Sequence, residues 1–233
     1  MSLLSISGMR TSIGQYAILH DISLEVPEGG VFVLLGRNGA GKTTTLRSIM
    51  GLWRPSPGSV RLRGADITGL HTADIARKGI AYVPENMGIF GGLTVAENMV
   101  LATRKGQFDP ARLKRVHGLF PALEQFWTKQ AWSLSGGQKQ MLSVARAIIE
   151  PRDLILIDEP TKGLAPAIVD AMAQAFREIA ETTTILLVEQ NFAFARSLGR
   201  DMAVIDDGRI AHAGPMEAFA ADAELQDRLL GLS

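Results

Sequence analysis

The chain has no cysteine, only three tryptophans and two tyrosines, and no apolar run close to the ~20 residues that a membrane-spanning helix requires. The lack of cysteine excludes disulfides and thiolate metal sites and is compatible with a reducing compartment. Lys plus Arg equals Asp plus Glu, at 24 each, so no overall field attracts nucleic acid, and we expect no nucleic-acid partner. If the protein works at a membrane, we expect another chain to do the crossing.

What is present is the composition of a folded protein. Of 233 residues, 46% are hydrophobic and 21% are charged, which is enough apolar material for one large domain or two small lobes. Residues 1–6 contain neither a basic segment nor an apolar stretch of adequate length, so we expect no secretory signal.

The most informative stretch is 36–43, which has the pattern G-x-x-x-x-G-K-T of a P-loop. An apolar run at 31–35 before it predicts a buried strand, and the spacing of apolar residues over 42–50 predicts a helix. An ordinary glycine-rich turn would explain the glycines but not the Lys-Thr pair. Backbone N–H groups and the positive helix end would surround phosphate, while Lys42 would reach the β- and γ-phosphates and Thr43 would bind Mg²⁺. The residues expected to bind ATP here are Gly36, Arg37, Asn38, Gly39, Ala40, Gly41, Lys42, Thr43 and Thr44.

A second stretch, 134–138, precedes an apolar-periodic helix that we expect to stop at Pro151. Ser135 and Gln138 have the spacing of a capping box. Two glycines in the first turn cost roughly 1 kcal/mol each against alanine, and open N–H groups for a phosphate would be the compensating gain. A plain N-cap with incidental glycines is the alternative, and the P-loop favours the phosphate interpretation. The segment consists of Leu134, Ser135, Gly136, Gly137 and Gln138.

A third stretch combines a continuous apolar run at 154–157 with two acidic residues, Asp158 and Glu159. The run predicts a central parallel strand, whose carboxyl end would carry both carboxylates. In a chain with a P-loop, these carboxylates have natural separate roles: Asp158 in the magnesium shell and Glu159 as the base for attacking water.

The remaining pattern predicts an α/β fold that is rich in strands in its first third. Helices are predicted to start at Thr94, with a capping box to Glu97, and at Asp109, followed by Pro110. Strands are predicted near 4–9, 17–26, 59–63, 79–83 and 184–188, a further helix over 168–179, and a hairpin over 202–211.

In their type and order, these three motifs resemble the ATP-binding-cassette (ABC) ATPases, and the resemblance covers essentially the whole chain. The LSGGQ signature at 134–138 is the specific part, since P-loops alone occur in kinases and GTPases. The resemblance implies a P-loop NTPase fold with a RecA-like core at 1–84 and 150–233, an N-terminal antiparallel β region and a helical lobe at 85–149. It also implies hydrolysis of ATP with Mg²⁺.

Finer details resemble the smaller ATPase subunit of branched-chain amino acid importers, the LivF type. These details are Glu85 in place of the usual glutamine, the phrase Gly-Leu-Ala-Pro at 163–166, and Val-Glu-Gln-Asn at 188–191. The corresponding subunit of urea importers is a similar alternative. A soluble ABC ATPase that acts on nucleic acid or ribosomes usually carries an inserted coiled coil or a second cassette, and neither is present.

The resemblance also implies partners. ATP would lie between the P-loop of one subunit and the signature of another, either a second, LivG-like ATPase or another copy of this chain. Two transmembrane permease subunits would dock around 85–90, with Phe90 either as a contact or as a buried anchor of the loop, and a solute-binding protein would take part indirectly. The chain would lie peripherally on the cytoplasmic face of the cell membrane.

Three positions depart from the wider family. Gln190 stands where histidine is usual, and we expect it to orient the attacking water, since a glutamine cannot take up a proton. Glu85 would act as a further magnesium ligand. Ile13 stands where an aromatic residue usually stacks on adenine, so either apolar contact replaces stacking or nearby Tyr16 supplies the ring.

Overall fold

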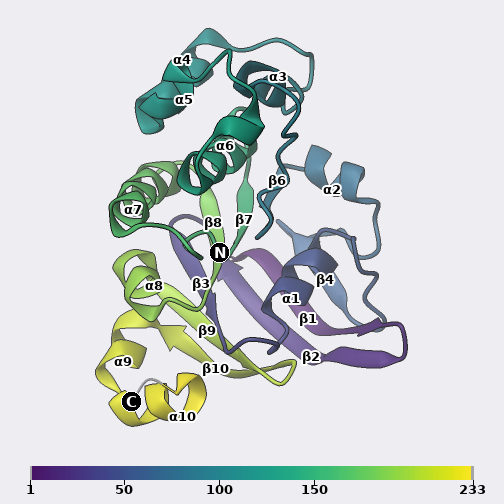
Figure 1. Cartoon of the computed structure of the whole chain (residues 1–233). Helices are drawn as coiled ribbons and strands as arrows, with labels where there is room; N and C mark the ends of the chain where they lie inside the picture. Colours follow the sequence, from purple (N-terminus) through teal and green to yellow (C-terminus); the bar gives the residue numbers. More distant parts are fainter. Residues whose placement is uncertain (1, 232–233) are drawn as a thin grey trace.

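The computed structural model describes residues 2–231, and its strands form a ten-stranded sheet (Figure 1). The strand order is β5-β4-β1-β2-β10-β9-β3-β8-β7-β6. The strands are β1 (Ser2–Ile13), β2 (Tyr16–Pro27), β3 (Val31–Leu35), β4 (Ser59–Leu62), β5 (Ala65–Asp66), β6 (Ile80–Val83), β7 (Leu154–Asp158), β8 (Thr184–Glu189), β9 (Asp201–Asp206) and β10 (Arg209–Pro215).

Helices cover the sheet and extend from one end of it (Figure 1). They are α1 (Lys42–Ile49), α2 (Thr72–Arg77), α3 (Val95–Val100), α4 (Pro110–Leu119), α5 (Pro121–Gln125), the short 3-10 helix η1 (Ala131–Ser133), α6 (Gly136–Ile148), α7 (Pro166–Ala180), α8 (Phe192–Leu198), α9 (Met216–Ala221) and α10 (Ala223–Leu230).

The half of the sheet that carries the site is parallel. Strand β3 pairs in parallel with β8 and β9, and β7 pairs in parallel with β8 and β6. The five residues of β3 and the six of β8 are buried, because α6 and α7 cover one face and α1 with strands β1 and β2 covers the other. Burial on both faces explains their continuous apolar sequence. Parallel pairing brings the carboxyl ends of β3, β7 and β8 to one edge, where the P-loop and the acidic pair lie.

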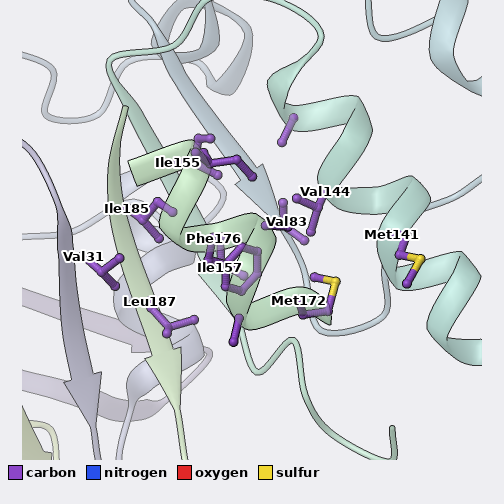
Figure 2. Close-up of a cluster of buried hydrophobic side chains, with 14 of the residues drawn as sticks. Val31, Val83, Met141, Val144, Ile155, Ile157, Met172, Phe176, Ile185 and Leu187 are labelled. Carbon is purple, nitrogen blue, oxygen red and sulfur yellow. The ribbon is translucent and has the colours of Figure 1, made fainter. Parts of the chain in front are cut away.

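Side-chain alternation along these strands divides the interior into two cores. In β3, Val31, Val33 and Leu35 belong to one core, whereas Phe32 and Leu34 belong to the other. Figure 2 shows the first core, in which strand residues face α6 and α7. The labelled side chains there are Val31, Val83, Met141, Val144, Ile155, Ile157, Met172, Phe176, Ile185 and Leu187.

The other half of the sheet is mainly antiparallel. Strands β1 and β2 form a long hairpin, and β4 and β5 extend it on the β1 side. Helix α1 contributes Leu46 and Ile49 to the second core, and Met50, directly after the helix, joins them together with buried side chains of this hairpin. The hairpin therefore supports the helix on which the P-loop ends.

Helices α3 to α6 lie together at one end of the molecule, beyond β6 and β7 (Figure 1). Their buried residues, such as Val95, Phe120 and Leu142, belong to the same core as Val33 of β3. The division into a core at 1–84 and 150–233 and a helical lobe at 85–149 remains a prediction.

Most local expectations are confirmed. The capping boxes Thr94–Glu97 and Ser135–Gln138 both form, and Asp109 caps α4. The predicted hairpin is formed by β9 and β10. Within residues 2–231, none of the helices has the length and apolarity needed to cross a membrane.

Candidate nucleotide site

The P-loop forms as expected, between β3 and α1. Helix α1 begins after Gly41, whose φ of 109° lies in the left-handed region that favours glycine. A Cβ atom there would come within 2.7 Å of Leu19 Cδ2, so any side chain at this position would push the Leu19 side chain aside. The first turn of α1 has no side-chain cap, and its backbone N–H groups therefore face the loop. Such a helix end attracts phosphate.

Lys42 is held inside the loop. Its ammonium group donates to the carbonyl oxygens of Gly36 at 2.8 Å and Arg37 at 3.1 Å, and it lies 3.2 Å from Glu159 Oε1. The side chain is only 4% exposed. The cation is thereby fixed at the place where phosphate oxygens would need it.

Thr43 and Asp158 meet across the edge of the sheet. The Thr43 hydroxyl donates to Asp158 Oδ1 at 3.0 Å, and the Tyr82 hydroxyl donates to Asp158 Oδ2 at 3.1 Å. Burial raises the pKa of Asp158, while these two hydrogen bonds work in the opposite direction. The site thus brings together a hydroxyl from α1 and a carboxylate from β7. Both supply oxygen ligands of the kind that Mg²⁺ prefers.

Glu159 has a left-handed backbone, with φ 45°, directly after β7. This conformation costs roughly 1–2 kcal/mol for a residue other than glycine, and such strain tends to occur at functional sites. Its N–H group donates to the carbonyl of Val188 at 2.9 Å, while its side chain, 11% exposed, faces Lys42. The sharp turn therefore aims the Glu159 carboxylate at the P-loop.

A cavity of about 230 Å³ lies over the P-loop. Its lining brings together several residues expected from the sequence, which are Asn38, Gly39, Gly41, Lys42, Thr43, Thr44, Glu85 and Glu159. Two further lining residues, Ile18 and Lys162, were not expected. The Glu85 carboxylate accepts a hydrogen bond from Lys162 Nζ at 2.5 Å. This hydrogen bond and the charges of the nearby carboxylates raise the pKa of Lys162.

Gln190 lines an adjoining pocket that also contains Glu159 and Lys162. Buried Glu189 organises this region, since its carboxylate accepts hydrogen bonds from Thr161 Oγ1 at 2.7 Å and from the N–H groups of Gln190 and Asn191, each at 3.0 Å. Burial raises the pKa of Glu189, and these hydrogen bonds oppose the rise. Glu189 therefore ties the loop after β7 to the loop after β8.

The signature segment lies at the N-terminus of α6, and its residues do not line the P-loop cavity. The Ser135 hydroxyl accepts from the N–H of Gln138 at 3.3 Å, and Gln138 Oε1 accepts from the N–H of Ser135 at 2.9 Å. Gly136 has open space where a side chain would be, whereas a Cβ at buried Gly137 would lie 2.8 Å from Ile168. Close packing against Ile168 thus explains why residue 137 is a glycine, independently of any phosphate. This explanation was not predicted from the sequence.

The predicted adenine contacts lie elsewhere. Ile13 and Tyr16 face each other at the tip of the β1–β2 hairpin, and Tyr16 is 67% exposed. Neither residue lines the P-loop cavity, where Ile18 of β2 supplies the apolar wall. Their contact with the base remains a prediction.

The comparisons with known proteins agree with this geometry. Residues 19–162, which include the P-loop, the signature and the acidic pair, match the model of the ABC transporter family. The chain belongs to the ABC transporter family. It is an ATPase of this family, with the P-loop and the Asp158–Glu159 pair at one edge of its sheet.

Relatives in the family match this ABC ATPase over nearly its whole length. The high-affinity branched-chain amino acid transport ATP-binding protein BraG of Pseudomonas aeruginosa is 36% identical over 98% of this chain and 100% of BraG. The probable branched-chain amino acid transport ATP-binding protein LivF of Archaeoglobus fulgidus is 31% identical over 92% of this chain and 93% of that protein.

Solved structures of ABC cassettes share the fold. An ATP-binding cassette of an ABC transporter in its ADP conformation has a TM-score of 0.82 at 22% identity, covering 97% of this chain and 98% of that one. A nucleotide-free ATP-binding cassette has a TM-score of 0.81 at 22% identity, with 97% of both chains covered. This likeness confirms the expected ABC ATPase fold.

Sequence reasoning missed three residues that shape the site: Ile18, Lys162 and Glu189. Glu189 follows an apolar strand, as Asp158 and Glu159 do, and this shared pattern was a usable signal. Lys162 and Ile18 carried no comparable signal, because they reach the cavity only through the tertiary fold.

Proposed function

We propose that this chain is the ATP-hydrolysing subunit that powers an importer of branched-chain or related amino acids. The observation that carries the proposal is the similarity to BraG, which spans 98% of this chain and the whole of its relative. The LivF protein of Archaeoglobus fulgidus supports the same class of solute.

In this proposal the loop at 36–44 binds the triphosphate through backbone N–H groups and through Lys42. Mg²⁺ would be held by Thr43 and Asp158, whose side-chain oxygens lie 3.0 Å apart, and it would neutralise phosphate charge. Within residues 2–231, no group of three His, Cys, Asp or Glu side chains is placed to hold a metal ion. Two protein oxygens fit Mg²⁺ even so, since it keeps several waters and binds substrate phosphates as well.

Glu159 acts as the base in the proposed reaction. Water attacks the γ-phosphorus, its proton passes to the Glu159 carboxylate, and the bond from phosphorus to the β-phosphate oxygen breaks, which releases ADP and phosphate. Gln190, in the pocket next to Glu159, orients the water through its side-chain amide. Glu189 fixes the backbone at Gln190 and so positions that amide.

The signature serves a second nucleotide-binding subunit, either a LivG-like ATPase or another copy of this chain. Support comes from the exposure of Ser135 and Gly136 and from their place outside the P-loop cavity. One chain offers two helix ends suited to phosphate, and one nucleotide sandwiched between two subunits uses both.

Two transmembrane permease subunits would dock in a groove of about 780 Å³ next to the loop at 85–90. Phe90 lies in this groove, is 49% exposed, and has Arg146 5.1 Å from its ring centre. The buried side chain of Asn98 bonds both the N–H and the carbonyl of Phe90 at 2.9 Å. This rigid loop with an exposed aromatic ring favours Phe90 as a partner contact. The chain would act peripherally at the cytoplasmic face of the membrane, with a solute-binding protein as an indirect partner.

The test combines a trapped variant with native membranes. Tagged Glu159→Gln should bind Mg-ATP but lose about 100-fold or more in turnover, because it lacks the base. After a pull-down from detergent-solubilised membranes with Mg-ATP, mass spectrometry should identify two membrane proteins and a second cassette ATPase. Lys42→Ala, which weakens nucleotide binding, is the matched control. Recovery of only soluble proteins or nucleic acid contradicts the transport role, and wild-type turnover of Glu159→Gln contradicts the assigned base.

A further inference from the structure

Four charged side chains in the P-loop cavity form a chain of alternating sign. Lys42 Nζ lies 3.2 Å from Glu159 Oε1, Glu159 Oε2 lies 3.8 Å from Lys162 Nζ, and Lys162 Nζ lies 2.5 Å from Glu85 Oε1. All four residues line the same cavity. They come from separate segments: the start of α1, the turn after β7 and the loop after β6.

Stability alone does not explain the link to Glu85. Lys162 and Glu85 are 62% and 41% exposed, and exposed ion pairs contribute little to folding because water screens them. The link does have a geometric consequence. Lys162 is shared by two carboxylates, and it is close to Glu85 but further from Glu159. Its place relative to Glu159 therefore depends on the presence of Glu85.

We propose that Lys162 is a positioning residue that restrains the Glu159 carboxylate, and that Glu85 controls this restraint by holding the Lys162 ammonium away from Glu159. The inference rests on the proposed role of Glu159 as base. A carboxylate held between two ammonium groups cannot turn toward the attacking water, whereas one held by Lys42 alone can. Movement of the loop that carries Glu85 would thus change where the Glu159 carboxylate points.

The alternative is that Glu85 binds Mg²⁺, which is the role expected for it from the sequence. The two roles make different predictions for a double-mutant cycle. If Glu85 works through Lys162, Glu85→Gln lets Lys162 close on Glu159 and lowers turnover only while Lys162 is present. If Glu85 binds the metal, the same change lowers turnover whether or not Lys162 is present.

The experiment measures kcat and KM of the assembled complex for wild type, Glu85→Gln, Lys162→Gln and the double variant. We expect Glu85→Gln to lower kcat by about threefold to tenfold and to have an effect below about twofold when combined with Lys162→Gln, as for contacting residues in one network. KM for Mg-ATP should stay near the wild-type value in all four. Lys162→Arg, which keeps the charge, should behave like wild type.

Two further variants make the outcome unambiguous. Glu28→Gln removes one carboxylate of a similarly exposed ion pair with Arg63, beyond the opposite end of β3, and should leave kcat unchanged. Glu159→Gln tests the base itself. If Glu159→Gln is inactive while Glu85→Gln and Lys162→Gln act independently of each other, the restraint is refuted and the proposed function stands. If Glu159→Gln turns over normally, the proposed function fails first.

Discussion

Helices α1 and α6 both begin at a glycine-containing motif that we propose binds phosphate, yet their first turns differ. Helix α1 starts after Gly41 with no side-chain cap, and its first residue, Lys42, is buried. Helix α6 starts with a complete capping box between Ser135 and Gln138, and Ser135 is exposed. The first helix end lies inside a cavity of its own chain, whereas the second lies on the surface.

The difference indicates how the two ends are used. The uncapped end of α1 leaves its donors to the ligand, and Lys42 and Glu159 are arranged around it. The cap on α6 already satisfies the N–H of Gln138, so this helix is stable before any phosphate arrives. We infer that the P-loop binds the nucleotide of its own chain. The signature, which is already formed without a ligand, would then bind the nucleotide of a partner subunit.

The largest expected effect comes from Lys42, the first residue of α1. Lys42→Ala should lower the affinity of the isolated chain for Mg-ATP by about 10- to 100-fold, because a charge-assisted contact to phosphate is lost. Calorimetric titration measures this affinity. Lys139→Ala, in the first turns of α6, is the matched control and should bind like wild type. Equal losses in both variants would contradict the division of roles.

Replacing a glycine at the start of each helix by alanine should change the free energy of unfolding by different amounts. Gly41→Ala places a Cβ 2.7 Å from Leu19 in a left-handed backbone, and we expect a loss of about 2–4 kcal/mol in the free energy of unfolding. Gly136→Ala adds its methyl group to open space and should change stability by less than about 1 kcal/mol. Urea unfolding compares the two variants. A larger loss for Gly136→Ala than for Gly41→Ala would show that the packing at these helix ends is not as described.

Gly137 lies between these extremes. Gly137→Ala should lower the free energy of unfolding by about 1–2 kcal/mol, since the overpacking against Ile168 exceeds the gain in helix propensity. The double variant with Ile168→Ala removes the Cγ atoms that a Cβ at residue 137 would crowd, and it should lose less than the sum of the two single variants. A loss equal to that sum in the double variant would contradict the packing role of Gly137.

The cap itself has a smaller effect. Ser135→Ala should lower the free energy of unfolding by about 1 kcal/mol, because the N–H of Gln138 loses its acceptor. Its affinity for Mg-ATP in the isolated chain should remain that of wild type, which titration of the same sample can verify. Ser135→Asp, another good capping residue, should restore stability.

The smallest effect concerns pH and a second capping box. Hydrogen bonds from Thr94 hold the pKa of Glu97 below its ordinary value of 4.5. The carboxylate therefore contributes stability that is present above pH 4.5 and is lost as pH falls through the lower folded pKa. Glu97→Gln should be slightly less stable than wild type at pH 7 and equal to it in acid. The α6 box, whose Gln138 is neutral, should show no such dependence in Gln138→Ala. Urea midpoints across pH measure both.

The sequence was sufficient to predict the local parts of this site but not all of its contacts. Strand β3, the P-loop, both capping boxes and the Asp158–Glu159 pair follow from short-range patterns, since each is determined by neighbours in the chain. Contacts between segments were not predictable in this way. Lys162 meets Glu85 only because β6 and β7 are adjacent in the sheet, and Ile18 reaches the P-loop because β2 lies next to α1 in the fold. The left-handed backbone of Glu159 likewise leaves no mark in the sequence.

The most direct measurement is the turnover of the assembled complex with Gly136→Glu at saturating Mg-ATP, together with Mg-ATP binding to the isolated variant. The new side chain has open space, and an acidic residue suits a helix N-terminus, so the fold should be unaffected. Its carboxylate would repel the phosphate of a partner's nucleotide. We predict wild-type binding by the isolated chain and a large loss of turnover in the complex. Loss of binding in the isolated chain, or normal turnover in the complex, would contradict the use of the signature by a partner subunit.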